Sequence, residues 1–237
     1  MRKLLSISIA LLLTAIGAQA QVIKTSDLEK YAKERYGDKW LEAAANLQPE
    51  IKLDKNQSIT YQQVIDAPGK TKEQLYVAVN YWVTSTFVKD KQAISLNDKE
   101  AGSIIISSTL ADIAQHMGGV QSFSVHITPV IKIDIKDGKV RATLTVQNYD
   151  ILRKSGGWVN VAVDVAAITA GVADDSAPVE VKYDEQWEIT KRYPFADKDK
   201  QKKVSSKALV MTHAYSSVVM DKIAEAVKSA GDEGDDW

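Results

Sequence analysis

The residues able to perform chemistry are few in this chain of 237 residues. It has three histidines, His116, His126 and His213, and no cysteine, so a cysteine nucleophile is excluded. The histidines do not form a metal-binding pattern such as H-E-x-x-H, and no serine lies in a G-x-S-x-G motif. Acidic pairs such as Asp184 and Glu185 are adjacent, so in an extended segment they point to opposite faces. We therefore expect no enzyme activity, no metal and no cofactor, with a hydrolase as the least favoured function.

A protein-binding surface is the first alternative to catalysis. Trp158 and Trp187 are large aromatic residues of the type that anchors protein interfaces. Pro129 interrupts a strand pattern and cannot donate a ladder hydrogen bond, so we expect the strand to lie at a sheet edge or to bulge there. Such an edge is open to pairing with a partner chain. These three residues are the candidate binding surface.

A ligand pocket is the second alternative. His213, Ser216 and Ala224 share the apolar face of the last predicted helix, where their size could leave a cavity against the sheet. Such a cavity would hold a small apolar ligand. His213 has another interpretation as a hydrogen-bonded core histidine, which is the commoner role on an apolar face.

The first twenty residues have the three parts of a secretory signal peptide. Two basic residues precede the apolar run Leu4–Ile16, and Ala18 and Ala20 form an A-x-A cleavage site before Gln21. The apolar run is shorter than the roughly 20 residues that span a bilayer. Because no cysteine follows, we expect neither a lipid anchor nor disulfides. The expected product is a soluble periplasmic or secreted protein, cleaved between Ala20 and Gln21.

The expected mature chain is mildly acidic. The whole sequence has 30 basic and 31 acidic residues, and removing residues 1–20 leaves 28 basic residues and a net charge of −3. Nucleic acid is therefore excluded as a partner, because phosphate binding needs a basic field. No later apolar run reaches membrane length. The remaining length suits one large domain.

Two helices have sequence signals for where they begin. Ser26 and Glu29 form a capping box for the first, and Gly37 is expected to bend or break it. Thr71 and Gln74 form a second capping box, which opens a strongly amphipathic helix.

The clearest strand signal is a hairpin around Asp137-Gly138. Odd positions from 123 to 135 are apolar, and a two-residue turn places them opposite the apolar positions that follow. The predicted register pairs Ile135 with Val140, Ile133 with Ala142, Ile131 with Leu144 and, on the other face, Asp134 with Arg141. Further strands are expected at 58–66, 94–96, 103–107, 158–165 and 179–189.

These elements predict four parts of the chain. They are a signal peptide at 1–20, an N-terminal helix and linker at 21–56, an α+β domain at 57–230 and an acidic tail at 231–237. The domain contains an insertion near 151–178 and ends with a long helix at 205–230.

One stretch resembles a known family. The motifs are Val64-Ile65-Asp66-Ala67-Pro68-Gly69-Lys70-Thr71-Lys72, then Glu73-Gln74-Leu75-Tyr76, Trp82 and Asn97-Asp98-Lys99-Glu100-Ala101-Gly102. They resemble an uncharacterised family of exported Bacteroidetes proteins, described as a domain of unknown function with a TBP-like fold. The resemblance covers about residues 58–149. It implies a strand-helix-strands-helix order with a curved antiparallel sheet and helices on one face, to which this chain adds an N-terminal helix.

The fold name does not supply a function, because function depends on sites. We expect a noncatalytic envelope protein that binds or scaffolds an unknown protein partner. The alternative is a binder of a small apolar ligand between the sheet and the C-terminal helix. An apolar pocket of about 300 Å³ or more under that helix would favour the ligand. A filled core and an exposed aromatic patch would favour the protein partner.

Overall fold

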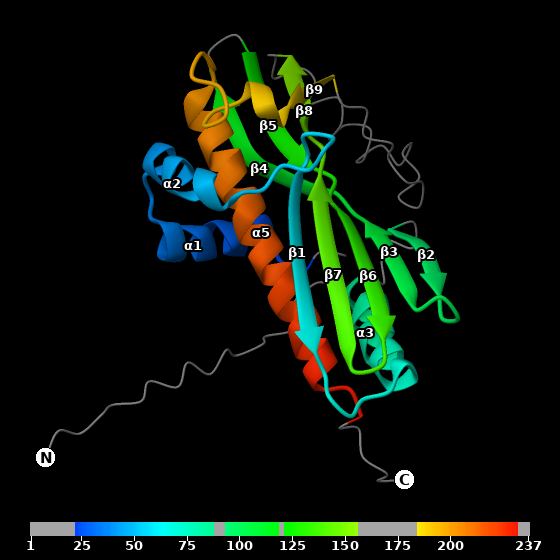
Figure 1. Cartoon of the computed structure of the whole chain (residues 1–237). Coiled ribbons are helices and arrows are strands. Elements are labelled where there is room, and N and C mark those ends of the chain that lie inside the picture. Colours follow the sequence, from blue (N-terminus) through cyan, green and yellow to red (C-terminus); the bar gives the residue numbers. More distant parts are fainter. Residues whose placement is uncertain (1–21, 88–92, 119–120, 156–183, 232–237) are drawn as a thin grey trace, which may run out of the picture.

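The computed structural model describes residues 22–87, 93–118, 121–155 and 184–231, which form two antiparallel sheets with helices packed against them (Figure 1). The first sheet has the order β1-β7-β6-β3-β2 and the second β4-β5-β8-β9. The strands are β1 Ile59–Asp66, β2 Ile94–Asp98, β3 Ser103–Ser107, β4 Leu110–Met117, β5 Gln121–Ile127, β6 Val130–Lys136, β7 Lys139–Val146, β8 Asn148–Ser155 and β9 Glu185–Glu188. The predicted α+β class is confirmed.

The two sheets are connected as one strongly bent sheet. Three strands of the first sheet are each adjacent along the chain to a strand of the second: β3 to β4, β6 to β5 and β7 to β8. The order β7-β6-β3 in the first sheet corresponds to the order β8-β5-β4 in the second. At the bend, the hydroxyl oxygens of Thr109 and Thr128 lie 3.1 Å apart. Thr128 also donates to Asp150 at 3.1 Å. The curvature expected of the sheet is therefore concentrated in this corner.

Pro129 lies in the corner and corrects one prediction. The strand expected through residues 123–135 ends at Ile127 and a new one begins at Val130. Pro129 itself is buried, and the strands on both sides of it are central in their sheets. A sheet edge at Pro129 is therefore wrong, because the missing N–H is accommodated by a change of sheet.

The hairpin around Asp137-Gly138 is confirmed in full register. β6 and β7 pair Ile135 with Val140, Ile133 with Ala142, Ile131 with Leu144 and Asp134 with Arg141. On the open face, Arg141 donates to Asp134 at 2.7 Å. The hairpin is central, since β1 continues the sheet beside β7 and β3 beside β6.

The N-terminal helix is divided as expected but does not begin as expected. α1 is Thr25–Tyr36, α2 is Trp40–Leu47, and the 3-10 helix η1 is Gln48–Glu50. Gly37, at φ +89°, ends α1. The predicted capping box of Ser26 is wrong: the N-cap of α1 is Lys24, two residues earlier, and within the described residues no side chain caps the helix. The hydroxyl of Thr25 instead donates to the carbonyl oxygen of Ala111 in β4 at 2.9 Å.

Two longer helices complete the helical layer. α3 is Lys72–Thr86 and opens with the predicted capping box of Thr71 and Gln74. α5 is Lys202–Lys228 and follows the 3-10 helix η2, Ile189–Lys191. α5 contacts α1, α2 and α3 as well as strands of both sheets, and it runs the length of the molecule (Figure 1). Within the described segments, no helix combines the length and apolar character needed to cross a membrane.

The C-terminal part of the chain differs from the predicted elements in two places. Residues 151–155, the first part of the predicted insertion, belong to β8, and residues 156–183 lie outside the described residues. The strand expected at 179–189 ends at Glu188, because Ile189 begins a 3-10 helix; β9 is Glu185–Glu188, and residues 179–183 lie outside the described residues. The strand expected at 158–165 and the acidic residues after Gly231 lie outside the described residues.

Candidate functional site

His213 is a hydrogen-bonded histidine on α5. Its Nδ1 lies 3.1 Å from the hydroxyl of Tyr61, and the ring of Tyr36 meets it edge-on with centroids 5.3 Å apart. Burial lowers the pKa of His213 below its ordinary value; Glu50 opposes this change and Arg35 reinforces it. The imidazole is therefore neutral near pH 7, as the core-histidine interpretation requires.

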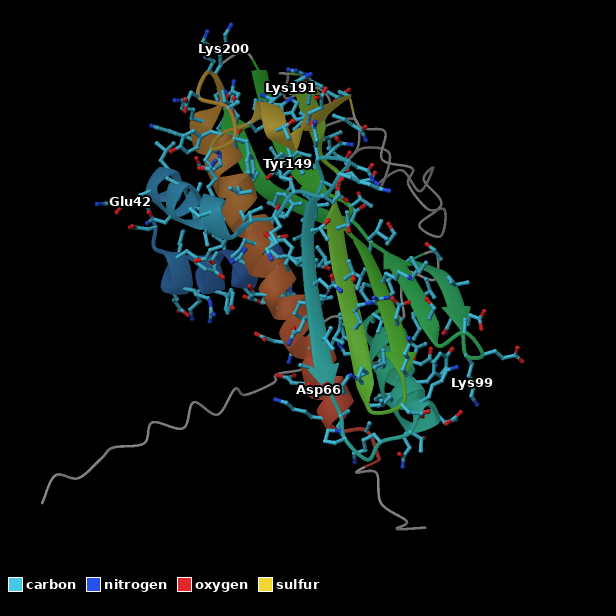
Figure 2. All side chains as sticks on the ribbon, in the orientation of Figure 1. Glu42, Asp66, Lys99, Tyr149, Lys191 and Lys200 are labelled. Carbon is cyan, nitrogen blue, oxygen red and sulfur yellow. The ribbon has the colours of Figure 1, made fainter. Side chains whose placement is uncertain are left out.

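The other two residues of the predicted pocket do not join His213 in a cavity. Ser216 is buried, and its hydroxyl donates to the carbonyl of Thr212 at 2.9 Å. Ala224 lies 11 residues beyond His213, about 16 Å along the helix. Tyr149, near the start of β8, is only 1% exposed (Figure 2). The hollows described below are lined by other residues and contain none of these three.

The predicted aromatic surface is not formed by Trp187. Its side chain is 4% exposed and packs edge-on against Phe123, with ring centroids 5.2 Å apart. The guanidinium of Arg192 covers the ring at 3.7 Å, and the indole N–H donates to Glu185 at 3.0 Å. Trp187 is therefore a core residue, because Phe123 and Arg192 pack on its ring. Trp158 lies outside the described residues.

A serine–histidine pair was not predicted from the sequence. Ser124 and His126 in β5 point to the same side, and Ser124 Oγ lies 2.9 Å from His126 Nε2. Asp112 Oδ1 approaches the same nitrogen at 3.8 Å. A catalytic triad needs the carboxylate on the opposite ring nitrogen, and Ser124 is only 1% exposed. The pair therefore lacks triad geometry. The polar face of its strand predicts a surface position for His126, and this prediction is wrong, because the residue is buried.

An open apolar feature of the described chain lies between α3 and α5. Val77 is 60% exposed and Tyr81 is 68% exposed, and they follow each other at i, i+4 on α3. Two adjoining hollows of about 380 and 700 Å³ meet beside them. We name this feature the α3/α5 groove, defined by Val22, Val77, Ala78, Tyr81, Ala226 and Ser229.

The lining shows how the two helices are arranged. Glu73 and Gln74, early in α3, share one hollow with Gly231, whereas Thr86, at the end of α3, shares the other with Lys222. The helices therefore run antiparallel along the groove. Charges are sparse there, and Lys222 pairs with Glu225 on its own helix at 2.8 Å.

A polar chain fixes α3 in place beneath the groove. The hydroxyl of Tyr76 donates to Asn97 in β2, and the amide of Asn97 donates to Asn80 at 2.7 Å. The buried stripe of α3 contains Leu75, Val79 and Val83, which the amphipathic pattern predicted. Val77 and Tyr81 lie off that stripe, and apolar residues on the polar face were the signal that could have found the groove.

Comparisons with known proteins support the fold. Residues 61–150 match the family model described as "Domain of unknown function (DUF4468) with TBP-like fold", which is less than half of the chain. No curated protein matches the chain in sequence.

Two solved structures are also similar. A TBP-like protein from Parabacteroides distasonis ATCC 8503 has 13% identity and a TM-score of 0.49, over 76% of this chain and 98% of that chain. A DUF4468 family protein from Bacteroides ovatus ATCC 8483 has 13% identity and a TM-score of 0.35, over 54% of this chain and 94% of that chain. The resemblance predicted from the sequence is thus confirmed: residues 61–150 match the model of the DUF4468 domain of unknown function, with its TBP-like fold.

Proposed function

We propose that this protein is a noncatalytic envelope protein that binds another protein through the α3/α5 groove. The observation that carries the proposal is the exposure of Val77 and Tyr81, which are 60% and 68% exposed beside adjoining hollows. Exposed apolar residues gathered at a groove are a common feature of protein interaction sites. Tyrosine is also among the residues that contribute most to binding energy at such sites.

The alternative, a small apolar ligand under α5, has less support. Tyr149, Ser216 and the His213–Tyr61 pair occupy that region with buried or hydrogen-bonded side chains. The α3/α5 groove is instead open to solvent along one side of α3. An open groove between helices suits a polypeptide, whereas small ligands favour sites that bury most of their surface.

The expected occupant is an amphipathic helix of the partner. α3 lines the groove from Glu73 to Thr86, a length of about 20 Å or nearly four helical turns. Two antiparallel helices present ridges between which a third helix can pack. Apolar residues at i, i+4 and i+7 of the partner would meet Val77, Ala78 and Tyr81. Because the groove carries few charges, the buried face of the partner is expected to be uncharged.

Cross-linking in the native cell tests the proposal. A photoactivatable amino acid replaces Tyr81 in one variant and Val64 in a control, since Val64 is also exposed but lies on β1. We expect a specific adduct only from position 81, with the cross-linked peptide forming an amphipathic helix. A synthetic copy of that peptide should bind the purified protein, and Tyr81→Ala should weaken binding about 30-fold, or about 2 kcal/mol.

Two results would overturn this function. One is equal affinity of the peptide for the wild type and for Tyr81→Ala. The other is a stoichiometric small lipid, with no protein partner, in native mass spectra of the protein purified from its own envelope.

A further inference from the structure

A separate hollow of about 410 Å³ lies at the start of α2. Lys39, Trp40, Leu41, Glu42 and Lys203 line it, and its wall is almost entirely apolar, so the lysines contribute their methylene groups to the wall and their ammonium groups lie at its rim. Trp40 is half-buried, so part of its ring remains available. Figure 2 shows Glu42 at this side of the molecule and Lys99, in the β2–β3 turn, at the opposite side. The hollow shares no lining residue with the α3/α5 groove and is distinct from it.

Lysines from three elements gather around Trp40. Lys39 precedes α2 and Lys203 lies on α5, and both line the hollow. The ammonium groups of Lys33 on α1 and Lys207 on α5 lie 5.8 and 5.7 Å from the centre of the indole ring. These distances are in the range of cation–π attraction.

One carboxylate shows how the ring is oriented. Glu29 accepts from both Lys33 and Lys207 at 2.7 Å. Two cations on opposite faces of the indole would be too far apart for one carboxylate to bridge at that distance. Lys33 and Lys207 therefore cover the same face of Trp40, and the rest of the ring borders the hollow.

The charges around the hollow do not balance. The four lysines face two carboxylates, Glu29 between its two lysines and Glu42, which lies 3.9 Å from Lys39. Burial raises the pKa of Glu29, but hydrogen bonds from Lys207 and Lys33 outweigh this and hold its pKa below the ordinary value. Glu29 is therefore ionised near pH 7. In formal charges, four lysines face two carboxylates, which leaves two positive charges uncompensated. An anionic ligand would be attracted to this site.

We propose that the Trp40 site, formed by Lys33, Lys39, Trp40, Lys203 and Lys207, binds an anionic sugar residue of an acidic polysaccharide. The apolar face of a sugar ring packs on the indole, and its carboxylate or sulfate group meets the ammonium groups of Lys39 and Lys203. The volume is at the lower end of the range for ligand sites, which suits one or two sugar rings.

A nucleic acid fits the same site less well. Proteins that bind single strands use several aromatic residues, on which successive bases stack, along a positively charged path. The hollow has one aromatic ring, and the chain as a whole has a net charge of −1. A single sugar ring with one acidic group needs only one aromatic ring and a few nearby ammonium groups, which the site offers.

Titration of the purified protein with oligosaccharides tests this proposal. The probes are hyaluronan fragments, which carry carboxylates, chondroitin sulfate fragments, which add sulfates, and neutral maltooligosaccharides. The readouts are isothermal titration calorimetry and the NMR signal of the Trp40 indole N–H, assigned with Trp40→Phe. We expect an acidic probe to bind and to shift that signal, and the preferred acidic probe identifies the anionic group.

Charge-reversal variants connect binding to the site. Lys39→Glu/Lys203→Glu changes two exposed lysines and should weaken binding about tenfold or more. Lys55→Glu/Lys99→Glu has the same change in net charge away from the site and should bind as the wild type does. Binding of neither acidic probe, equal binding of the neutral probe, tighter binding of an oligodeoxynucleotide, or equal weakening by both variants would overturn the proposal. The α3/α5 groove is unchanged in these variants, so this result is independent of the protein-binding function.

Discussion

Asp199 lies buried just before α5, and several donors surround its carboxylate. It accepts from the backbone N–H of Tyr193 at 3.0 Å and of Gln201 at 2.8 Å, and from the hydroxyl of Ser205 at 2.5 Å. The guanidinium of Arg192 lies 3.5 Å away. A single side chain therefore connects the residues just after η2, among them Arg192 over Trp187, to the first turn of α5.

Removing this carboxylate should destabilise the fold. Asp199→Ala leaves two backbone amides and a buried hydroxyl without their acceptor, and we expect a loss of about 2 to 3 kcal/mol in the free energy of unfolding. Denaturant unfolding at pH 7 measures the loss. Asp197→Ala is the matched control, since Asp197 is exposed two residues away and should change stability by less than about 0.5 kcal/mol. Equal stability of the two variants would contradict this role.

The same contacts predict how the effect depends on pH. Burial raises the pKa of Asp199, but the hydrogen bonds and the charge of Arg192 outweigh it, so the pKa lies below its ordinary value. Because the pKa of Asp199 is lower in the folded chain, its stabilising effect is complete above about pH 3.9, the ordinary pKa of an aspartate in an unfolded chain. The effect is lost as the pH falls through the pKa of Asp199 in the folded protein. The difference in the free energy of unfolding between the wild type and Asp199→Ala should therefore shrink only in acid. A constant difference down to about pH 2 would contradict this assignment.

Single residues show what the sequence could not predict. His126 was assigned from the alternation along its strand and Trp187 from its residue type, and neither signal tells what covers a side chain in the fold. Ser124 shields one nitrogen of His126, and Arg192 and Phe123 pack on Trp187. Lys33, Trp40 and Lys207 come from three helices, so only the packing of those helices brings them together.

Elements were predicted best where two local signals agreed. The β6–β7 hairpin combined alternation with an Asp-Gly turn, and the start of α3 combined a capping box with an apolar stripe. The capping box at Ser26 failed because Thr25 is tied to Ala111, a contact 86 residues away in sequence. At Pro129, proline chemistry predicted an interruption of the strand, but not its passage into another sheet.

The turn between β2 and β3 depends on one glycine, Gly102. Gly102 has φ +65°, and a Cβ there would lie 2.6 Å from the carbonyl oxygen of Ile135. We expect Gly102→Ala to cost about 2 kcal/mol or more in thermal or denaturant unfolding. Gly69→Ala is the control, since Gly69 has φ +80° but open space around it, and should cost about 1 kcal/mol. Equal losses would show that backbone conformation, and not the close approach to β6, sets the cost.

The whole molecule depends on continuity between the two sheets. Three strand pairs cross the corner, and α5 contacts strands on both sides of it. Neither sheet has a separate hydrophobic core, because the buried residues of both belong to one cluster. The described part of the chain should therefore unfold as one cooperative unit.

Native-state hydrogen exchange can test this cooperativity. Ile133→Ala removes a fully buried side chain from β6 and should cost about 2 to 5 kcal/mol. If the sheets unfold together, protection of the β5 and β8 amides falls as much as that of the β6 and β7 amides. Val64→Ala, at an exposed position of the first sheet, should leave protection nearly unchanged. Faster exchange confined to the first sheet would show two independent units.

The position of Val22 links chain processing to binding. Val22 lines the α3/α5 groove, and the predicted cleavage between Ala20 and Gln21 would make it the second residue of the mature protein. Cleavage would then create an α-amino group, with an ordinary pKa of about 7.7 to 8.0, one residue from the groove. The precursor has an amide and twenty further residues at that point. Maturation would thus change both the charge and the accessibility of the groove, so that a partner could distinguish the processed protein from its precursor.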